Sequence, residues 1–403
     1  MKFHVIIVCF VQFSLYEKTF ADDHPDTYLS IEELVQKYGY PIESHEITTE
    51  DEYMITIYRI RHGKDDKTTN TKPILLMHGL FSQCEHYITN GMNNGSLAYL
   101  LADNGYDVWL GNSRGNQHGR KHKYLSPEEK EFWDFSWHEI GMYDIPAMVD
   151  HILSETGKKK LHYVGHSQGG TALYIMTSMK PEYQEKLGLV SLLAPAGYFR
   201  HFRSPLIWPL VVMERELVLL TQLTNIYELP PKYINLPELL LTGCKHTTFR
   251  LRQICEISYH LGIGGDSGLF RQEMLPLVVR FIPTASTRQP LHYSQAINSG
   301  HFRPWDYGED QNYEIYGRAM PPDYPIENIT TPIAIYYGNN DILTSLEDIE
   351  EISDVLPNVV RRYLIPNVKW THMDFIMATN AARMLNIPLL NFLKKFDSKL
   401  ESK

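Results

Sequence analysis

Short apolar runs alternate with amphipathic stretches along the first half of the chain. Runs of this length predict buried strands, and the stretches between them predict helices. The predicted strands occupy residues 74–79, 107–112, 161–166 and 188–195, and the predicted helices occupy residues 31–38, 95–104, 132–154 and 171–179. A β-hairpin is predicted at residues 44–62, where polar and apolar residues alternate. This order predicts an α/β fold with a mostly parallel sheet covered by helices on both faces.

The alternation of strand and helix stops after residue 197. Residues 198–325 contain helix-like apolar stretches and several prolines but no strand–helix–strand unit. Strand patterns return at residues 332–338 and 361–366, and a terminal helix is predicted to run to about residue 395. The sequence therefore predicts one α/β core, residues 22–197 and 326–403, with a mostly helical insertion at 198–325.

The amino terminus has the features of a secretory signal. Lys2 precedes an apolar stretch at residues 5–15, and a small-x-small sequence ends at Ala21, so residues 1–21 are predicted to be removed. The apolar stretch is too short to span a bilayer. A second apolar stretch, 206–223, is interrupted by a proline and three charged residues. We expect a secreted protein without a transmembrane anchor, with the lysosome as the alternative destination.

The charge bears on possible partners, and two sequons fit the secretory route. The formal net charge is −10 and no extended basic cluster is present, which argues against a nucleic-acid partner. N-x-[ST] sequons at Asn94 and Asn328 predict glycosylation.

Three cysteines remain once the predicted signal is removed: Cys84, Cys244 and Cys255. An odd number in an oxidising compartment predicts one pair and one free thiol. Cys244 and Cys255 are the expected pair because they would close a short local loop. Cys84 is expected to be a small buried side chain.

The sequence GHSQG at residues 165–169 lies between a predicted strand and a predicted helix. This G-x-S-x-G pattern is typical of the nucleophile elbow, a sharp turn that exposes a serine. A serine hydroxyl is a weak nucleophile and needs a neighbouring base. The pattern therefore predicts that Ser167 is the nucleophile of a hydrolase.

A base and an orienting carboxylate follow the two later predicted strands. Asp341 comes after the strand at 332–338, and His372 comes after the strand at 361–366. The order Ser, Asp, His is the order in which this kind of fold presents a catalytic triad. His372 is predicted to be the general base, and Asp341 is predicted to orient it. Asp374 is the rival carboxylate, and a local hydrogen-bonding role is expected for it.

An acyl-transfer site also needs N–H groups that stabilise the oxyanion. The amide of Gln168, directly after the nucleophile, and the amide of Leu80, in the loop after the first long strand, are the expected donors. His78 and His166 are expected to support these loops rather than to carry protons. No metal or cofactor is expected in the reaction.

Several longer segments resemble the acid lipase family of α/β-hydrolases, which includes gastric and lysosomal acid lipases and insect secreted lipases. They extend from about residue 30 to about residue 395 and include LLMHGLFS, LADNGYDVWLGNSRGN, EFWDFSWHEIG, LHYVGHSQGG, LHYSQAINSGHFRPWDYG, YYGNND and WTHMDF. The resemblance implies a triad at Ser167, Asp341 and His372, a cap at 198–325, and a disulfide near Cys244–Cys255. The chain departs from the family pattern at Tyr87, Gly170 and residues 281–287, and the last departure is expected to alter the shape of the cap.

Together these features predict a cofactor-independent lipase acting on neutral lipids at a lipid–water interface. A non-catalytic lipid carrier, a short-chain esterase and a serine peptidase are the alternatives. For the apolar sequence LIWPLVVMERELVLL, residues 206–220, the expectation is a helix mostly buried against the α/β core, and the alternative is an apolar lining of the substrate site.

Overall fold

The computed structural model describes residues 26–65, 72–91, 95–205, 207–235, 267–269, 277 and 280–401. The predicted signal, Asn94, Cys244 and Cys255 lie outside these residues. Cys84 lies within them and is a buried free thiol. Within these ranges no helix is both long enough and apolar enough to cross a membrane.

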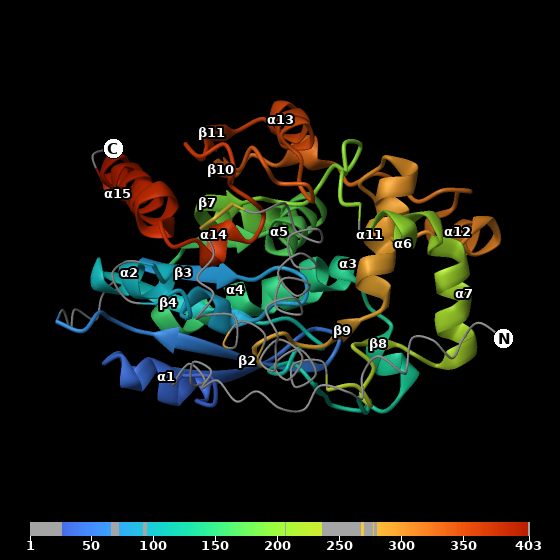
Figure 1. Ribbon diagram of the computed structural model, residues 1–403, viewed down its shortest axis with the longest axis horizontal. Coiled ribbons are helices and arrows are strands. Elements are labelled where there is room, and N and C mark those ends of the chain that lie inside the picture. The colour runs from blue at the N-terminus through green and yellow to red at the C-terminus, as the bar shows by residue number, and fades with distance from the viewer. Residues whose placement is uncertain are drawn as a thin grey trace, which may run out of the picture.

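A central sheet lies between layers of helices (Figure 1). Among the described residues it contains nine strands: β1 (Glu43–Thr48), β2 (Tyr53–Ile60), β3 (Lys72–Met77), β4 (Tyr106–Leu110), β5 (Lys121–His122), β6 (Leu161–His166), β7 (Leu187–Leu193), β10 (Ile333–Tyr337) and β11 (Val359–Leu364). Their order is β1-β2-β4-β3-β6-β7-β10-β11, with β5 beside β2. The strands from β4 to β11 pair in parallel, while β2 is antiparallel to β1, β4 and β5. The predicted hairpin and parallel sheet are confirmed.

Alternate side chains of each central strand enter two separate apolar cores. In β3, Ile74 and Leu76 pack on one face of the sheet, whereas Leu75 and Met77 pack on the other. The first face is covered by α1 (Ile31–Lys37), α2 (Leu97–Asp103), α14 (Asp374–Met377) and α15 (Ile387–Glu401). The second is covered by α4 (Ile145–Thr156), α5 (Gln168–Met179) and α13 (Leu346–Val355). Because both faces are covered, the central strands β3, β4, β6, β7 and β10 are buried along nearly their whole length, and their sequences are mostly apolar.

Short helical turns connect these elements: η2 (Cys84–Tyr87), η3 (Lys130–Trp133), α3 (Trp137–Glu139), η4 (Ile140–Asp144), η5 (Pro181–Lys186), η7 (Ile326–Asn328) and η8 (Ala382–Asn386). The prediction of a single helix at 132–154 is wrong for residues 132–136. The helix begins at Trp137, because the Ser136 hydroxyl accepts from the His138 N–H and Glu139 accepts from the Ser136 N–H. This capping box fixes a helix start in the middle of the apolar pattern.

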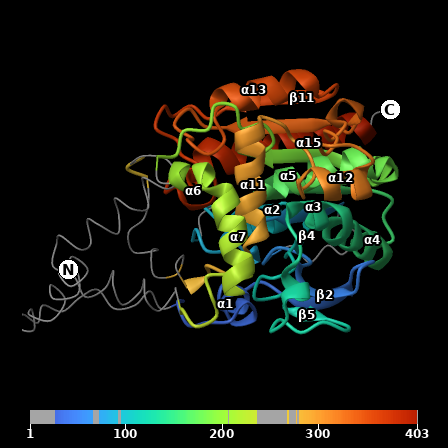
Figure 2. The same ribbon diagram turned by 90° about the vertical axis from the view of Figure 1, so that its right-hand side faces the viewer.

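The insertion between β7 and β10 contains α6 (Trp208–Val212), α7 (Glu214–Thr224), β8 (Glu228–Leu229), β9 (Ala285–Ser286), α11 (Arg288–Ser299) and α12 (Glu309–Tyr316). Figure 2 shows α6, α7 and α11 in front of the α/β core. The strands β8 and β9 form a small antiparallel pair apart from the main sheet.

The expectation that most of the apolar sequence at 206–220 is buried is wrong. Val211 is fully buried, but Trp208 is 49% exposed, Val212 is 64% exposed and Leu219 is 55% exposed. The cause is the break between α6 and α7, since the sequence forms two short helices instead of one. The first of them touches α11 through the Val211 carbonyl, which accepts from Asn298 Nδ2 at 2.8 Å. The second exposes Leu219, Leu220 and Leu223.

Candidate active site

Ser167 occupies the turn between β6 and α5. Its backbone has φ 52° and ψ −115°, a left-handed conformation that is rare for a residue with a side chain. The Ser167 N–H donates to the carbonyl of Leu193, the last residue of β7, at 2.9 Å. The neighbouring strand therefore holds the strained turn in place, and the side chain of Ser167 remains partly exposed.

Glycines allow the backbone segments around this turn to approach closely. A Cβ atom on Gly169 would lie 2.5 Å from the carbonyl oxygen of Met77, and one on Gly165 would lie 2.8 Å from the carbonyl carbon of Gly169. A Cβ on Gly79 would lie 3.0 Å from the Cβ of Ser167. The loop after β3 is thus packed directly against the turn that carries Ser167.

Asp341 and His372 form a buried pair at the ends of β10 and β11. Nδ1 of His372 lies 2.8 Å from Oδ2 of Asp341, and both side chains are at most 5% exposed. Asp341 also accepts from the N–H groups of Leu343 and Thr344 and from the Thr344 hydroxyl, which lies 2.7 Å away. These donors hold the Asp341 carboxylate in place as the acceptor for the N–H at Nδ1, which leaves Nε2 of His372 as the acceptor nitrogen of the ring.

Asp374, the rival carboxylate, faces another direction. It accepts from the backbone N–H and the hydroxyl of Thr371, at 2.7 and 2.9 Å, and from the hydroxyl of Ser267. Asp374 therefore fixes the loop before α14, while Asp341 is the carboxylate next to His372.

His166 connects the two halves of the site. Its Nε2 lies 3.0 Å from the backbone carbonyl of His372, and the two rings are 4.9 Å apart. Burial and the neighbouring His372 hold the pKa of His166 well below its usual range, so the ring is neutral and donates this hydrogen bond. The residue before Ser167 thus positions the loop of His372, and the prediction of a supporting role for His166 did not name this partner.

Leu80 and Gln168 lie on the two backbone segments that meet at Ser167. Gln168 is the first residue of α5, where N–H groups have no acceptor within the helix. Leu80 directly follows Gly79, the residue that approaches Ser167. The Gln168 side chain, in addition, donates to Oε1 of Gln289 in α11 at 2.7 Å. This buried contact joins the turn to the insertion, and no sequence signal predicted it.

His78 supports the loop after β3 from behind. Its Nδ1 donates to the Gly79 carbonyl at 2.8 Å, and its Nε2 accepts from Asn116 Nδ2 at 3.3 Å. Burial lowers the pKa of His78 to about 4. A proton on Nε2 would remove the acceptor for Asn116, so the loop is built around a neutral imidazole.

We expect His78 to make the folded state sensitive to acid. Its folded pKa lies below the unfolded value of about 6.5, so the unfolded chain binds the proton first. The contribution of the neutral His78 ring to the free energy of unfolding is fully present above pH 6.5 and is lost as the pH falls towards 4. The loss for this residue is about 3 kcal/mol. Urea unfolding at pH 7 and pH 4 should show a smaller loss in His78→Gln than in the wild type. His301→Gln, at an exposed histidine, should keep the wild-type loss, and equal losses in all three proteins would contradict the assignment.

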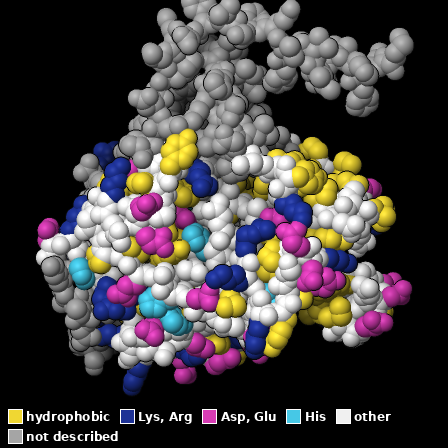
Figure 3. Space-filling model, turned by 90° about the horizontal axis from the view of Figure 1, so that it is seen from below, with side chains coloured by type: hydrophobic (Ala, Val, Ile, Leu, Met, Phe, Trp, Pro, Cys, Tyr) yellow, Lys and Arg dark blue, Asp and Glu magenta, His cyan; other side chains and the backbone are white. Residues whose placement is uncertain are grey.

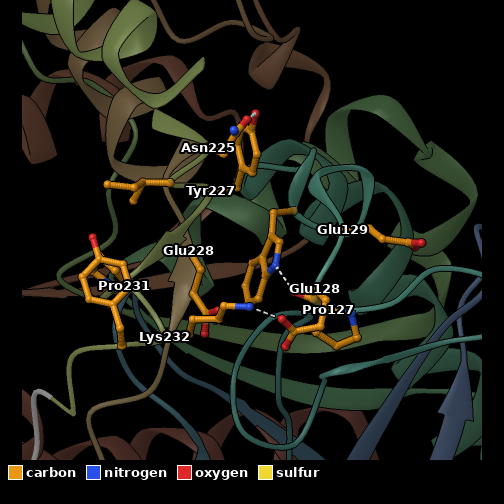
Figure 4. Close-up of a pocket in the computed structure, with 11 residues that line it drawn as sticks. Pro127, Glu128, Glu129, Asn225, Tyr227, Glu228, Pro231 and Lys232 are labelled. Carbon is orange, nitrogen blue, oxygen red and sulfur yellow. Dashed lines mark hydrogen bonds and ion pairs between the residues drawn. The ribbon is translucent and has the colours of Figure 1, made fainter. Parts of the chain in front are cut away.

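A separate hollow of about 130 Å³ lies where the insertion meets the core. Figure 4 shows Lys232 reaching Glu128 across it, and Trp133 in its wall donates from Nε1 to the Pro127 carbonyl at 2.8 Å. None of Ser167, Asp341 and His372 lines this hollow. It is a junction between the two parts of the chain and is distinct from the candidate active site.

Comparisons with known proteins agree with this geometry. A family model described as a partial alpha/beta-hydrolase lipase region matches residues 31–91, and one for the alpha/beta hydrolase fold matches residues 72–206. Lipase 1 of Drosophila melanogaster is 39% identical over 92% of this chain and 81% of its own length. Gastric triacylglycerol lipase of Bos taurus is 35% identical over 94% and 95%. Human lysosomal acid lipase/cholesteryl ester hydrolase is 32% identical over 98% and 99%.

These relatives match at least 92% of this chain and at least 81% of their own lengths, which confirms the resemblance and the α/β-hydrolase fold. They are lipases, in agreement with a hydrolase that acts on carboxylic esters. The chain therefore belongs to the acid lipase family of α/β-hydrolases.

Proposed function

We propose that this protein is a secreted lipase that hydrolyses the esters of neutral lipids through an acyl-enzyme. The pairing of His372 with Asp341, next to the strained turn of Ser167, is the observation that supports the proposal best. His372 takes the proton of Ser167 as the serine oxygen attacks the ester carbonyl, and it gives that proton to the departing alcohol. Water, activated by the same ring, then releases the fatty acid.

The other predicted residues have supporting roles in this mechanism. Asp341 keeps the Nδ1 proton of His372 in place and stabilises the charged ring. The N–H groups of Leu80 and Gln168 stabilise the negative oxygen of the tetrahedral intermediate. Every step uses side chains and backbone groups of the chain itself, so the mechanism requires no metal or cofactor.

The substrate class follows from the relatives. One is named for triacylglycerol and another for cholesteryl ester, so triacylglycerols and sterol esters are the proposed substrates. A panel of esters from two to eighteen carbons, with triolein and cholesteryl oleate, tests this class. Hydrolysis confined to acetate and butyrate esters would identify an esterase instead.

The insertion at 198–325 is proposed to act as a cap, with 22–197 and 326–403 forming the catalytic core. Exposed apolar side chains lie on its helices and at the junction of α6 and α7: Trp208, Leu210, Val212, Met213, Leu219, Leu220, Leu223, Tyr313 and Ile315. Figure 3 shows hydrophobic side chains gathered on the right, the side on which Figure 1 places α7 and α12. An exposed apolar surface of this kind suits contact with a lipid surface.

We expect replacement of Leu219 and Leu223 by glutamine to weaken activity on emulsified triolein about tenfold, because both side chains would leave water at the lipid surface. Activity on a dissolved aryl ester should change less than twofold. Val368→Gln, at a 75% exposed valine outside the insertion, is the matched control. Equal losses on both substrates, or none, would contradict the assignment of this surface.

Export and its modifications are part of the same proposal. Residues 1–21 are the proposed signal, and Cys244–Cys255 is the proposed disulfide. Asn94 and Asn328 are the proposed glycosylation sites, and Asn328 is exposed in η7. Amino-terminal sequencing of the secreted protein, with peptide mapping before and after reduction and deglycosylation, tests each of them.

A further inference from the structure

Three potential metal ligands meet behind the loop that follows β3. Sγ of Cys84 lies 3.3 Å from Oε2 of Glu85, and Nε2 of His118 lies 2.8 Å from Oε1 of the same carboxylate. One donor atom from each residue falls within 4.8 Å of the other two. Cys84 and Glu85 are at most 2% exposed, while the His118 side chain is 14% exposed. A thiol, a carboxylate and an imidazole thus converge at a place that remains open on one side.

A second layer of contacts orients these ligands. Asn112 donates from Nδ2 to Cys84 Sγ at 3.3 Å, and its Oδ1 accepts from the Cys84 N–H at 3.2 Å. The Tyr58 hydroxyl lies 3.1 Å from Nδ1 of His118, so the ring directs Nε2 towards Glu85. Amide donors to a sulfur and a polar partner on the second imidazole nitrogen are the contacts that tune metal ligands.

We propose that Cys84, Glu85 and His118 bind a divalent transition-metal ion of the zinc class. Sulfur, nitrogen and carboxylate oxygen are the ligand atoms that zinc prefers, and water at the open side would complete four-coordination. Binding of the metal displaces the proton of the Cys84 thiol into solvent, so that the sulfur binds as a thiolate. The Nε2 proton of His118 moves to Nδ1, where the Tyr58 oxygen accepts it.

Charge balance supports a divalent ion at this place. A thiolate, a carboxylate and a neutral imidazole carry two negative charges, which one divalent ion neutralises. Burial of the site then leaves no net charge in the interior, which avoids the large cost of an unpaired buried ion.

A second group of potential ligands lacks the burial and the sulfur atom of the Cys84 site. His201, Asp348 and Glu351 also lie within ligand distance of one another, but the His201 side chain is 46% exposed and Glu351 is paired with Arg200. This group has no sulfur, and an arginine already neutralises part of it. It therefore serves as a control.

The proposed ion would join two loops next to the candidate active site. Cys84 and Glu85 belong to η2, a few residues after Leu80, and His118 follows β4. The ion would stabilise the loop after β3 without touching Ser167. The inference is independent of the proposed lipase activity, because it concerns binding and stability only.

Cobalt titration of the full-length secreted protein, after removal of metals with a chelator, tests the site. We expect one Co²⁺ per chain and a thiolate-to-cobalt charge-transfer band in the near ultraviolet. Addition of Zn²⁺ should remove the band and raise the Tm. Cys84→Ser should abolish the band although Cys244 and Cys255 remain. Tyr58→Phe should weaken Co²⁺ binding about tenfold, and His201→Gln should change nothing.

Absence of the band in the wild-type protein would overturn the proposal. This outcome does not depend on whether any variant folds. A band of unchanged intensity in Cys84→Ser would overturn it as well, because the sulfur ligand would then be another cysteine.

Discussion

Replacement of Ser167 by alanine is expected to lower the hydrolysis of long-chain esters by at least about 10³-fold, and His372→Ala should cost about as much. The two side chains act as one unit, since the serine attacks only while the histidine accepts its proton. Initial rates on an emulsified triacylglycerol and a dissolved aryl ester measure the effect. Ser154→Ala, at an exposed serine of α4, is the matched control and should retain full activity.

The two carboxylates near His372 provide a sharper comparison. Asp341→Asn should lower the rate by about 10⁴-fold, because an amide in contact with Nδ1 favours the wrong tautomer of His372. Asp374→Asn should have a much smaller effect, since Asp374 contacts Thr371 and Ser267. The reverse order of the two losses would show that Asp374 orients the base.

Replacement of Arg114 by methionine should have the largest effect on stability, a loss of about 3–5 kcal/mol in the free energy of unfolding. Arg114 is buried, its Nε donates to Asp144 at 2.7 Å, and its Nη2 donates to Asp51 at 2.8 Å. Methionine fills much of the space but leaves the buried Asp144 and the partly buried Asp51 without this cation. Urea unfolding at pH 7 measures the loss.

An exposed ion pair gives the control for this variant. Arg203 contacts Glu347 at the surface, where both side chains are more than 40% exposed. Arg203→Met should therefore cost less than about 1 kcal/mol. Similar losses in the free energy of unfolding for the two variants would contradict this explanation, in which the burial of Arg114 makes its ion pairs important for stability.

Most of the fold and of the candidate site could be predicted from local sequence patterns. The central strands were predictable because they are buried on both faces and their sequences are mostly apolar, and the hairpin was predictable because polar and apolar residues alternate in it. The turn at Ser167 was predictable because its glycines are required by close backbone contacts, such as that of Gly169 with Met77. Asp341 and His372 could be chosen among many acidic residues and histidines because each follows a predicted strand.

Contacts between distant parts of the chain had no such local signal. The hydrogen bond between Gln168 and Gln289 joins residues 121 positions apart, and Glu85 meets His118 across 33 positions. The exposure of Leu219 was also predicted wrongly, because an apolar pattern shows that a helix has an apolar face but not what that face contacts.

Labelling with a long-chain alkyl phosphonate tests whether Ser167 is the nucleophile, because the reagent reacts only with an activated nucleophile. We predict one phosphonyl group per chain, located on Ser167 by peptide mapping, and loss of triacylglycerol hydrolysis in proportion to labelling. A label on another residue, or a fully labelled protein that still hydrolyses triacylglycerol, would contradict it.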